Sequence, residues 1–588
     1  MPLMGSLYVG ASGLQTSQNA LNTTAHNLSN METVGYVRQQ VQQGSKGYVK
    51  ISVDPRSIAN KQYGLGVNYS RVKQVRDYFL DKTYRRESGR SMFYEVTTEV
   101  MEEAQSQLGE MHGEAFQNTM KDFWTSIQEL AKDPASSVTQ GLMVQRAEEF
   151  VLRATAVYNG LSSYQDNLNV QIKQQVEKIN SYGKQLLALN DKIRSIEAGN
   201  IEHANDLRDA RNQVLDELSE LVSINYGEDV SGAVWVQIEG VDFVKSDKCF
   251  EMELDVDAAT GFYTPFWPMN ATYTVNENGT KKYIIDGAEV FDLHRAVSTD
   301  LNTDVGGLKA MLLARGDHRA DYTDVAEGKY DKVSQSIIMN IQAEFDQLIH
   351  SVAVKVNEIL ANASGKVAEN AITATDENGN QYVLVNKGEM CWEDDPKGYM
   401  RKDDGSPIQL FSKVTTDGWK KVEADDGKFY WIYNEEVTNG EGGKPEGDTL
   451  YSINNLQVDP ELAQKPAMLG FRLPDGKEDK ATAEALKNAF TEENYTLNPN
   501  VKKRTTFVDY YTDLVSQIAN TGYVSRRIYE NQMGTVEATD AAREQVIGVS
   551  SDEELSNMIR FQNAYNASSR YINVVDQMLE HILNTLGA

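Results

Sequence analysis

Hydrophobic residues at the start of the chain fall on one narrow line. Leu7, Leu14, Leu21 and Leu28 are seven residues apart, which places them on one face of a helix. Thirteen of residues 1–31 are Ser, Thr, Asn or Gln, and none is Asp, Glu, Lys or Arg. An ordinary amphipathic helix packed on its own domain would also explain the leucine spacing. Because surface helices usually carry charges and unpaired charges are costly to bury, the missing charge favours a helix enclosed by other copies of the protein.

Residues 552–586 predict a second long helix, because they contain no Pro or Gly. Their apolar positions repeat every seven residues in two registers, a pattern typical of a coiled-coil seam. The first register is Met558, Tyr565, Ile572, Leu579 and Leu586, and the second is Phe561, Ser568, Val575 and Ile582. Ser551 and Glu554 resemble a capping box at the start of this helix. We expect the first and last helices to pair, so that the domains between them are built from discontinuous segments.

The middle of the chain also shows a helical period. In residues 137–222 the apolar positions alternate spacings of three and four, with an interruption at Gly199. Further helices are predicted at about 324–362 and 506–533. These segments together predict a long helical bundle beside the paired ends.

Two segments change to strand-forming patterns, residues 223–300 and 365–500. VWVQIEGVDFV and KFYWIY are rich in β-branched and aromatic residues, and short turn signals separate such runs. The turn signals are Asn278-Gly279, Asn378-Gly379, Asp404-Gly405, Asp417-Gly418 and Asp426-Gly427. The stretch NGEGGKPEGD at 439–448 predicts a flexible loop.

The sequence therefore predicts an α+β multidomain chain. Terminal coiled-coil helices and a long helical-bundle stem are formed by both chain ends, and two β-rich domains are inserted. The predicted domains are a terminal coiled-coil assembly domain (1–45 and 545–588), a helical stem domain (46–222, 301–364 and 501–544), a β-rich inserted domain (223–300) and a second, outer β-rich inserted domain (365–500).

The charge is unevenly distributed over these predicted domains. The 588 residues carry a net charge of −29, which argues against nucleic acid or an anionic membrane as the main partner. No stretch approaches the ~20 apolar residues that span a bilayer, so no membrane insertion is expected. Residues 223–300 and 365–500 carry −9 and −11, most of the total. Charge is thus concentrated in the parts expected on the outside.

No catalytic or metal-binding constellation is visible. The seven histidines match neither HExxH nor a zinc-ligand spacing, and Cys249 and Cys391 lie in β-rich segments without a motif. Asp376, Asn378 and Asn380 imitate the first ligands of a calcium loop. However, Gln381 and Lys387 replace the Gly and Glu that such a loop needs at positions six and twelve, which favours a hairpin turn. We therefore expect no enzyme activity, no cofactor and no metal.

Both ends of the chain resemble one known family. AHNLSNMETVGYVRQ at 25–39 is similar to the N-terminal signature shared by flagellar rod, hook and hook-associated proteins. GVSSDEELSNMIRFQNAYNASSRYINVVDQMLEHIL at 548–583 is similar to the C-terminal signature of its hook-associated members. Residues 204–222 and 305–317 resemble further segments of those members. In this family the chain turns sharply after the first helix, and Thr33, Gly35 and Tyr36 match that turn, where Gly can adopt a backbone angle that other residues oppose.

The resemblance implies a structural subunit of the bacterial flagellum that polymerises through its terminal helices into a homo-oligomer ring joining hook and filament. Implied partners are the hook protein, the next hook-associated protein and a cytoplasmic export chaperone on the C-terminal helix. The implied location is extracellular, in the flagellum, after export through the flagellar secretion apparatus without a cleaved signal peptide. The predicted assembly interface comprises the two helical seams (Leu7, Leu14, Leu21, Leu28; Met558, Phe561, Tyr565, Ile572, Val575, Leu579, Ile582, Leu586) together with Asn27, Asn30, Thr33, Gly35 and Tyr36.

Three alternatives remain at this stage. The chain could be another axial protein, such as a hook or distal rod protein, since these share the N-terminal signature. Its outer domains could act as a glycan-binding adhesin anchored by the stem. An enzyme inserted on the axial scaffold is the third, which the absence of a catalytic constellation disfavours.

Overall fold

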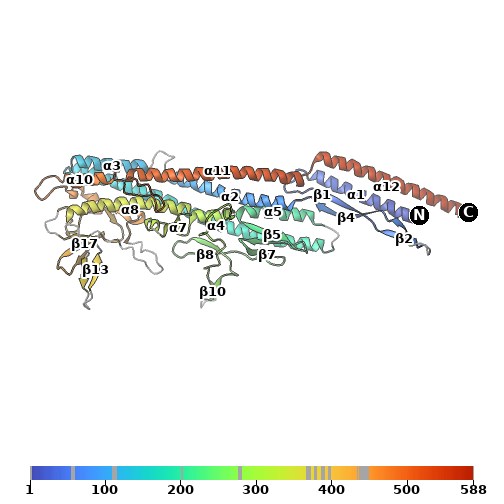
Figure 1. Cartoon of the computed structure of the whole chain (residues 1–588), viewed down its shortest axis with the longest axis horizontal. Helices are drawn as coiled ribbons and strands as arrows, with labels where there is room; N and C mark the ends of the chain where they lie inside the picture. The colour runs from blue at the N-terminus through green and yellow to red at the C-terminus, as the bar shows by residue number, and fades with distance from the viewer. Residues whose placement is uncertain are drawn as a thin grey trace.

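The computed structural model of the chain is a long rod with both termini at the same end (Figure 1). It describes residues 3–53, 60–108, 116–199, 203–275, 281–326, 328–365, 372–375, 381–385, 391–394, 399–433, 435 and 449–586. The first helix, α1 (Leu3–Ser29), and the last, α12 (Ser551–Leu586), lie side by side at that end, as the sequence predicts.

Two strand pairs accompany the terminal helices. β1 (Gln39–Ser45) pairs antiparallel with β4 (Val67–Gln74), and β2 (Tyr48–Val53) pairs antiparallel with β3 (Asn60–Gly64). The prediction that the helical stem starts at residue 46 is therefore wrong for this segment. Strands such as QQVQQGS are short and polar, so they lack the alternation of apolar and polar residues that identifies a strand.

Long helices build the stem. The elements are α2 (Tyr78–Gln107), α3 (Phe116–Lys132), α4 (Ser137–Glu197), α5 (Asn205–Leu221), α6 (Gly307–Arg315), η2 (Tyr322–Val325), α7 (Tyr330–Val333), α8 (Ile337–Ser364) and α11 (Phe507–Ile547). At 1.5 Å per residue, the 61 residues of α4 span roughly 90 Å along the stem. α11 continues well past the predicted end at residue 533 and packs along α2.

The first β-rich part lies against α4 and α5. β5 (Ile224–Glu228), β6 (Val234–Ile238) and β7 (Val241–Val244) form an antiparallel sheet. Two separate antiparallel pairs follow it: β8 (Glu253–Val256) with β9 (Tyr263–Phe266), and β10 (Thr272–Val275) with β11 (Lys281–Ile284). The predicted turn at Asn278-Gly279 lies outside the described residues, but the strands on either side of it do pair.

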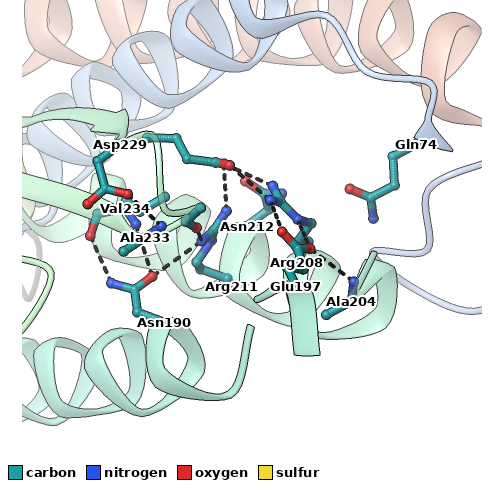
Figure 2. A network of polar contacts seen from close by, with 12 residues as sticks. Gln74, Asn190, Glu197, Ala204, Arg208, Arg211, Asn212, Asp229, Ala233 and Val234 are labelled. Atoms are coloured by element: carbon teal, nitrogen blue, oxygen red, sulfur yellow. Dashed lines mark hydrogen bonds and ion pairs between the residues drawn. The ribbon is translucent and has the colours of Figure 1, made fainter. Parts of the chain in front are cut away.

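A polar network fixes this part to the stem (Figure 2). The buried Asn190 amide on α4 donates to the Val234 carbonyl (2.9 Å) and accepts from the Val234 N–H (3.0 Å). Arg211 on α5 donates to the Gly232 carbonyl (2.7 Å) and to Glu228 (2.9 Å), and Arg208 joins Glu228 to Glu197 at the end of α4. Since the contacts reach two helices, the sheet is held rigidly on the stem.

The second β-rich part mixes strands and helices. Its elements are β12 (Ile372–Thr375), β13 (Gln381–Val385), β14 (Cys391–Glu393), β15 (Phe411–Lys413), β16 (Trp419–Glu423), β17 (Phe429–Tyr433), η4 (Ile453–Asn455), β18 (Leu456–Val458), α9 (Pro460–Gln464), η5 (Pro466–Leu469) and α10 (Lys480–Ala489). Phe411 and Phe490 pack edge-on against Phe123 of α3 at 6.0 and 5.6 Å between ring centroids. This segment therefore shares the core of the bundle at the end far from the termini.

The predicted turns of this part have different outcomes. Asp426-Gly427 connects the paired strands β16 and β17, with φ +77° at Gly427. Asp404-Gly405 also forms a turn, with φ +86° at Gly405. Asp417-Gly418 is not a hairpin turn, because β15 pairs with the distant β18 and not with β16. Asn378-Gly379 and the loop at 439–448 lie outside the described residues.

Candidate assembly interface

The face of α1 that meets α12 is made of small and polar residues. A Cβ added at Gly10 would lie 2.6 Å from Ile572 Cγ1, and one at Gly13 would lie 2.7 Å from Ser568 Oγ. Residues at the same alternating spacing of four and three along α1 are almost all buried: Ser6, Gly10, Gly13, Ser17, Ala20, Thr24 and Asn27. The two helix backbones therefore approach closely, with glycines at the contact.

The predicted leucine seam lies at the edge of this contact. Leu7, Leu14, Leu21 and Leu28 are each half-buried, while the smaller residues beside them fill the centre. The contact of these leucines with other copies stays a prediction, whereas small residues of α1 make the contact with α12. The leucines sit too far around the helix, and glycine allows a closer approach than any leucine could.

The predicted seam of α12 does face α1. Ile572 and Ser568 meet the two glycines, and Val575 is buried, with 3% of its surface exposed. The other members are half-buried: Met558, Phe561, Tyr565 and Leu579. Ile582, at 37% exposure, lies beyond the well-covered part, and the side chain of Leu586 lies outside the described residues. The role of either seam between copies stays a prediction.

Asn27 joins three elements at the base of the pair. Its side-chain amide donates to the Gln39 carbonyl of β1 (2.9 Å) and to Glu554 Oε2 of α12 (3.1 Å). Its oxygen accepts from the Gln39 N–H (3.0 Å) and the Tyr36 hydroxyl (2.8 Å). Asn27 is 1% exposed, so its side chain makes all of these hydrogen bonds out of contact with water. Asn27 and Tyr36, both predicted interface residues, thus organise the fold of the single chain.

Glu554 of α12 is the residue that binds Asn27 and Arg38, and the sequence did not predict this role. Arg38 Nε donates to Glu554 Oε1 (3.0 Å), and the other arm of Arg38 pairs with Glu553 Oε2 (2.8 Å). The predicted capping box is wrong, because the Glu554 carboxylate reaches across to Arg38 and Asn27 and not back to the helix start. A signal existed, since Glu554 is seven residues before Phe561 and so lies on the α12 seam.

The turn after α1 has the predicted sharp form. Gly35 has φ +78°, a backbone angle that side chains oppose. The Thr33 hydroxyl donates to Asn30 Oδ1 (3.3 Å), and the Asn30 amide donates to the His26 carbonyl (3.0 Å). The turn directs the chain from α1 onto β1, which brings Arg38 and Gln39 beside α12.

Asp209 of α5 connects this terminal part to the stem. Its carboxylate accepts from the Val37 N–H (3.3 Å) and from the Gln74 side chain (2.6 Å). Burial raises the pKa of Asp209 to about 7, against the hydrogen bonds, which lower it. The joint between stem and terminal helices therefore holds a carboxyl that titrates near neutral pH.

We expect the Asp209→Asn variant to be more stable than the wild type at pH 8. A folded-state pKa above the usual 3.8 means that stability falls as pH rises from about 4 through 7, and by up to about 4 kcal/mol in total. The amide mimics the protonated acid, so this slope disappears in the variant. Urea unfolding across pH 4–8 measures it, with Asp206→Asn as control because Asp206 is a largely exposed neighbour. An unchanged slope would contradict the assignment.

The histidine and cysteine side chains outside the terminal part were also considered as candidate site residues. His318 lies between Asp317 Oδ1 (2.6 Å) and Asp324 Oδ2 (3.0 Å); although burial opposes the charge, these hydrogen bonds raise its pKa to about 10. Cys249 is half-buried, Cys391 is buried, and no disulfide joins them. Among the described residues no three His, Cys, Asp or Glu side chains gather in a way that could hold a metal ion. The calcium-like turn that contains Asp376, Asn378 and Asn380 lies outside those residues.

Membrane insertion was also not expected from the sequence. In the described part of the chain, none of the helices combines the length and the apolar character needed to cross a bilayer.

Comparison with known proteins finds flagellar family models at both ends of the chain and in its middle. The model of the flagellar hook-associated protein FlgK helical domain matches residues 101–370. Residues 545–585 match the C-terminal model of the flagellar basal body rod FlgEFG proteins, and residues 7–36 match that of the flagella basal body rod protein. The two rod-type matches fall on α12 and α1, the paired terminal helices.

Full-length relatives agree with the models. Flagellar hook-associated protein 1 of Bacillus subtilis is 25% identical over 98% of this chain and 96% of its own length. The protein of that name in Escherichia coli is 22% identical over 99% and 100%, and that of Salmonella typhimurium 23% over 97% and 98%. A solved structure, the flagellar hook junction protein FlgK from Burkholderia pseudomallei, covers 80% of this chain and 100% of its own with 13% identity and a TM-score of 0.47.

The terminal helices, the stem and these matches define an axial protein of the bacterial flagellum, a structural component. More narrowly, the chain is similar over nearly its whole length to flagellar hook-associated protein 1, in agreement with its C-terminal signature. Hook and distal rod proteins are not favoured, because the FlgK helical-domain model matches residues 101–370 between the two rod-type matches.

Proposed function

We propose that the chain is a structural subunit of the junction between hook and filament, where copies polymerise through α1 and α12 without bond chemistry. The observation that carries this is a set of exposed apolar side chains along α12. The side chains concerned are Leu555, Ile559, Tyr571, Val574, Met578 and Leu583, which are 40–71% exposed. So many exposed apolar side chains on one helix mark an interaction site.

The absence of charge on α1 supports the same arrangement. No charged side chain occurs in residues 1–31, so neighbouring copies can cover the leucines at its edge without burying a charge. The leucines are half-buried in the single chain, which leaves apolar surface for such a contact. A homo-oligomer ring with α1 and α12 toward its centre would use both helices.

The rest of the rod suits the outer layers of that ring. In Figure 1 both β-rich parts lie on the side of the stem opposite α11. They correspond to segments 223–300 and 365–500, which hold most of the negative charge and are suited to face water. Contacts along the axis would be made to the hook protein on one side and the next hook-associated protein on the other.

The proposal includes a route by which the chain reaches the junction between hook and filament. The chain would leave the cell through the flagellar secretion apparatus without a cleaved signal peptide. A cytoplasmic chaperone would cover α12 before export, because its exposed apolar side chains would otherwise bind other copies early.

Deleting residues 552–588 tests the assembly mechanism. We expect the deleted chain to be exported but missing from the flagellum, because α1 then lacks its partner. A dye on Lys477→Cys, an exposed position of the second β-rich part, would locate the chain in intact flagella after both native cysteines are replaced. The full-length labelled chain is the control and should form one band between hook and filament. Normal incorporation of the deleted chain would refute the proposal.

A further inference from the structure

The terminal part contains a groove bounded on three sides. α1 lies between β1 and β4 on one side and α12 on the other, and the space they enclose has a volume of 1020 Å³. Gly13, Ser17 and Ala20 of α1 line it, with Val67 of β4 on one wall and Phe561 and Ala564 of α12 on the other. Small side chains along α1 leave the groove open to a bulky occupant.

The C-terminal end of α12 extends beyond its partner. Gly10 faces Ile572, Gly13 faces Ser568, and Asn27 bonds Glu554, so the helices run antiparallel. This register puts Leu3, the first described residue of α1, level with residue 578 or 579. Residues 579–586 of α12 continue past it, as Figure 1 shows at the C-terminus.

This C-terminal tip (residues 574–586) carries exposed apolar side chains. Val574 is 46% exposed, Met578 52% and Leu583 71%, and Ile582 adds to the same stretch at 37%. The tip points away from the stem, whereas the groove lies beside the first half of α12. A chain therefore cannot fill its own groove with its own tip.

The overhang, residues 579–586, is a free helical end that rises about 12 Å beyond α1.

Charge adds a specific pair. Arg560 lines the groove and lies over the Phe561 ring, without an ion pair to any described residue. Glu580 on the tip is exposed and likewise has no ion pair within the described part of the chain.

We infer that the groove of one copy receives the C-terminal tip of a neighbouring copy. This inference rests on the proposed function and names the surfaces that polymerise. Because groove and tip are different surfaces of the same molecule, the contact is head-to-tail and repeats from copy to copy. The Arg560–Glu580 pair then lies at the rim of each contact.

Cross-linking in intact flagella tests the contact. In a chain with Cys249→Ser and Cys391→Ala, we combine Ala564→Cys in the groove with Leu583→Cys on the tip. Oxidation is expected to yield disulfide-linked dimers and longer chains, whereas each single-cysteine variant gives none through this pair. Dye labelling at the junction first establishes that the chain is present. If the chain is absent from the junction altogether, the proposed function fails and not this contact alone.

A charge reversal provides an independent readout. Arg560→Glu and Glu580→Arg are each expected to reduce incorporation about two- to fivefold, and the double variant is expected to restore it. Arg570→Glu, an exposed arginine of α12 outside the groove, is the matched control. Either the cross-link or the rescue supports the inference. Absence of both, in flagella that contain the chain at the junction, would overturn it.

Discussion

Replacing Gly10 by leucine is expected to separate α1 from α12 and to remove the protein from the junction. A Cβ at this position would already lie 2.6 Å from Ile572 Cγ1 and 3.1 Å from Tyr571 Cδ1, so three further carbons have no room. Overpacking of this kind costs about 1–3 kcal/mol where a core can shift. Here both neighbours belong to the partner helix, so the helices must move apart.

Gly47→Leu is the matched control for this prediction. It adds the same side chain in the same terminal part, but no atom lies within 4 Å of a Cβ there. Counting dye-labelled molecules at the junction compares the two variants, and we expect at least a tenfold loss for Gly10→Leu alone. Equal incorporation of both variants would show that the close contact of α1 and α12 is not needed for assembly.

The pairing of the chain ends was predictable, whereas the residues that make it were not. Heptad spacing reports which side chains are large and apolar, and it identified the α12 seam through Ile572 and Val575. On α1 the same rule selected the leucines, but Gly10 and Gly13 are the residues that face Ile572 and Ser568. A pattern of large residues cannot show where two backbones approach, because that depends on the partner.

Segments governed by distant contacts were predicted least well. The β1–β4 pair consists mainly of polar residues and is stabilised by packing on α1, where the Val67 N–H donates to Ser12 Oγ (3.2 Å). The second inserted segment has the predicted strands, yet Phe411 and Phe490 join it to the core around Phe123. Local composition reveals strands but not which neighbouring domain they pack against.

Glu554→Ala is expected to loosen the base of the terminal helix pair by about 3 kcal/mol, because it leaves polar groups of a buried network without their partner. Glu554 is 2% exposed, and its removal takes an acceptor from Asn27 Nδ2 (3.1 Å) and from Arg38 Nε (3.0 Å). In this variant Asn27 keeps its hydrogen bonds to Gln39 of β1 and to Tyr36 but loses its bond to α12. Hydrogen exchange on the full-length chain, read at the Gln39 amide that donates to Asn27, reports the loss.

The chain supplies a control on the same arginine. Glu553 also pairs with Arg38 (2.8 Å), but its side chain is 61% exposed, so Glu553→Ala should cost no more than about 1 kcal/mol. Asn27→Ala alone and combined with Glu554→Ala completes a cycle, in which the double variant is expected to lose less than the sum of the single ones. Equal effects of Glu553→Ala and Glu554→Ala would mean that general attraction to Arg38, and not the buried network, holds α12 to the rest of the terminal part.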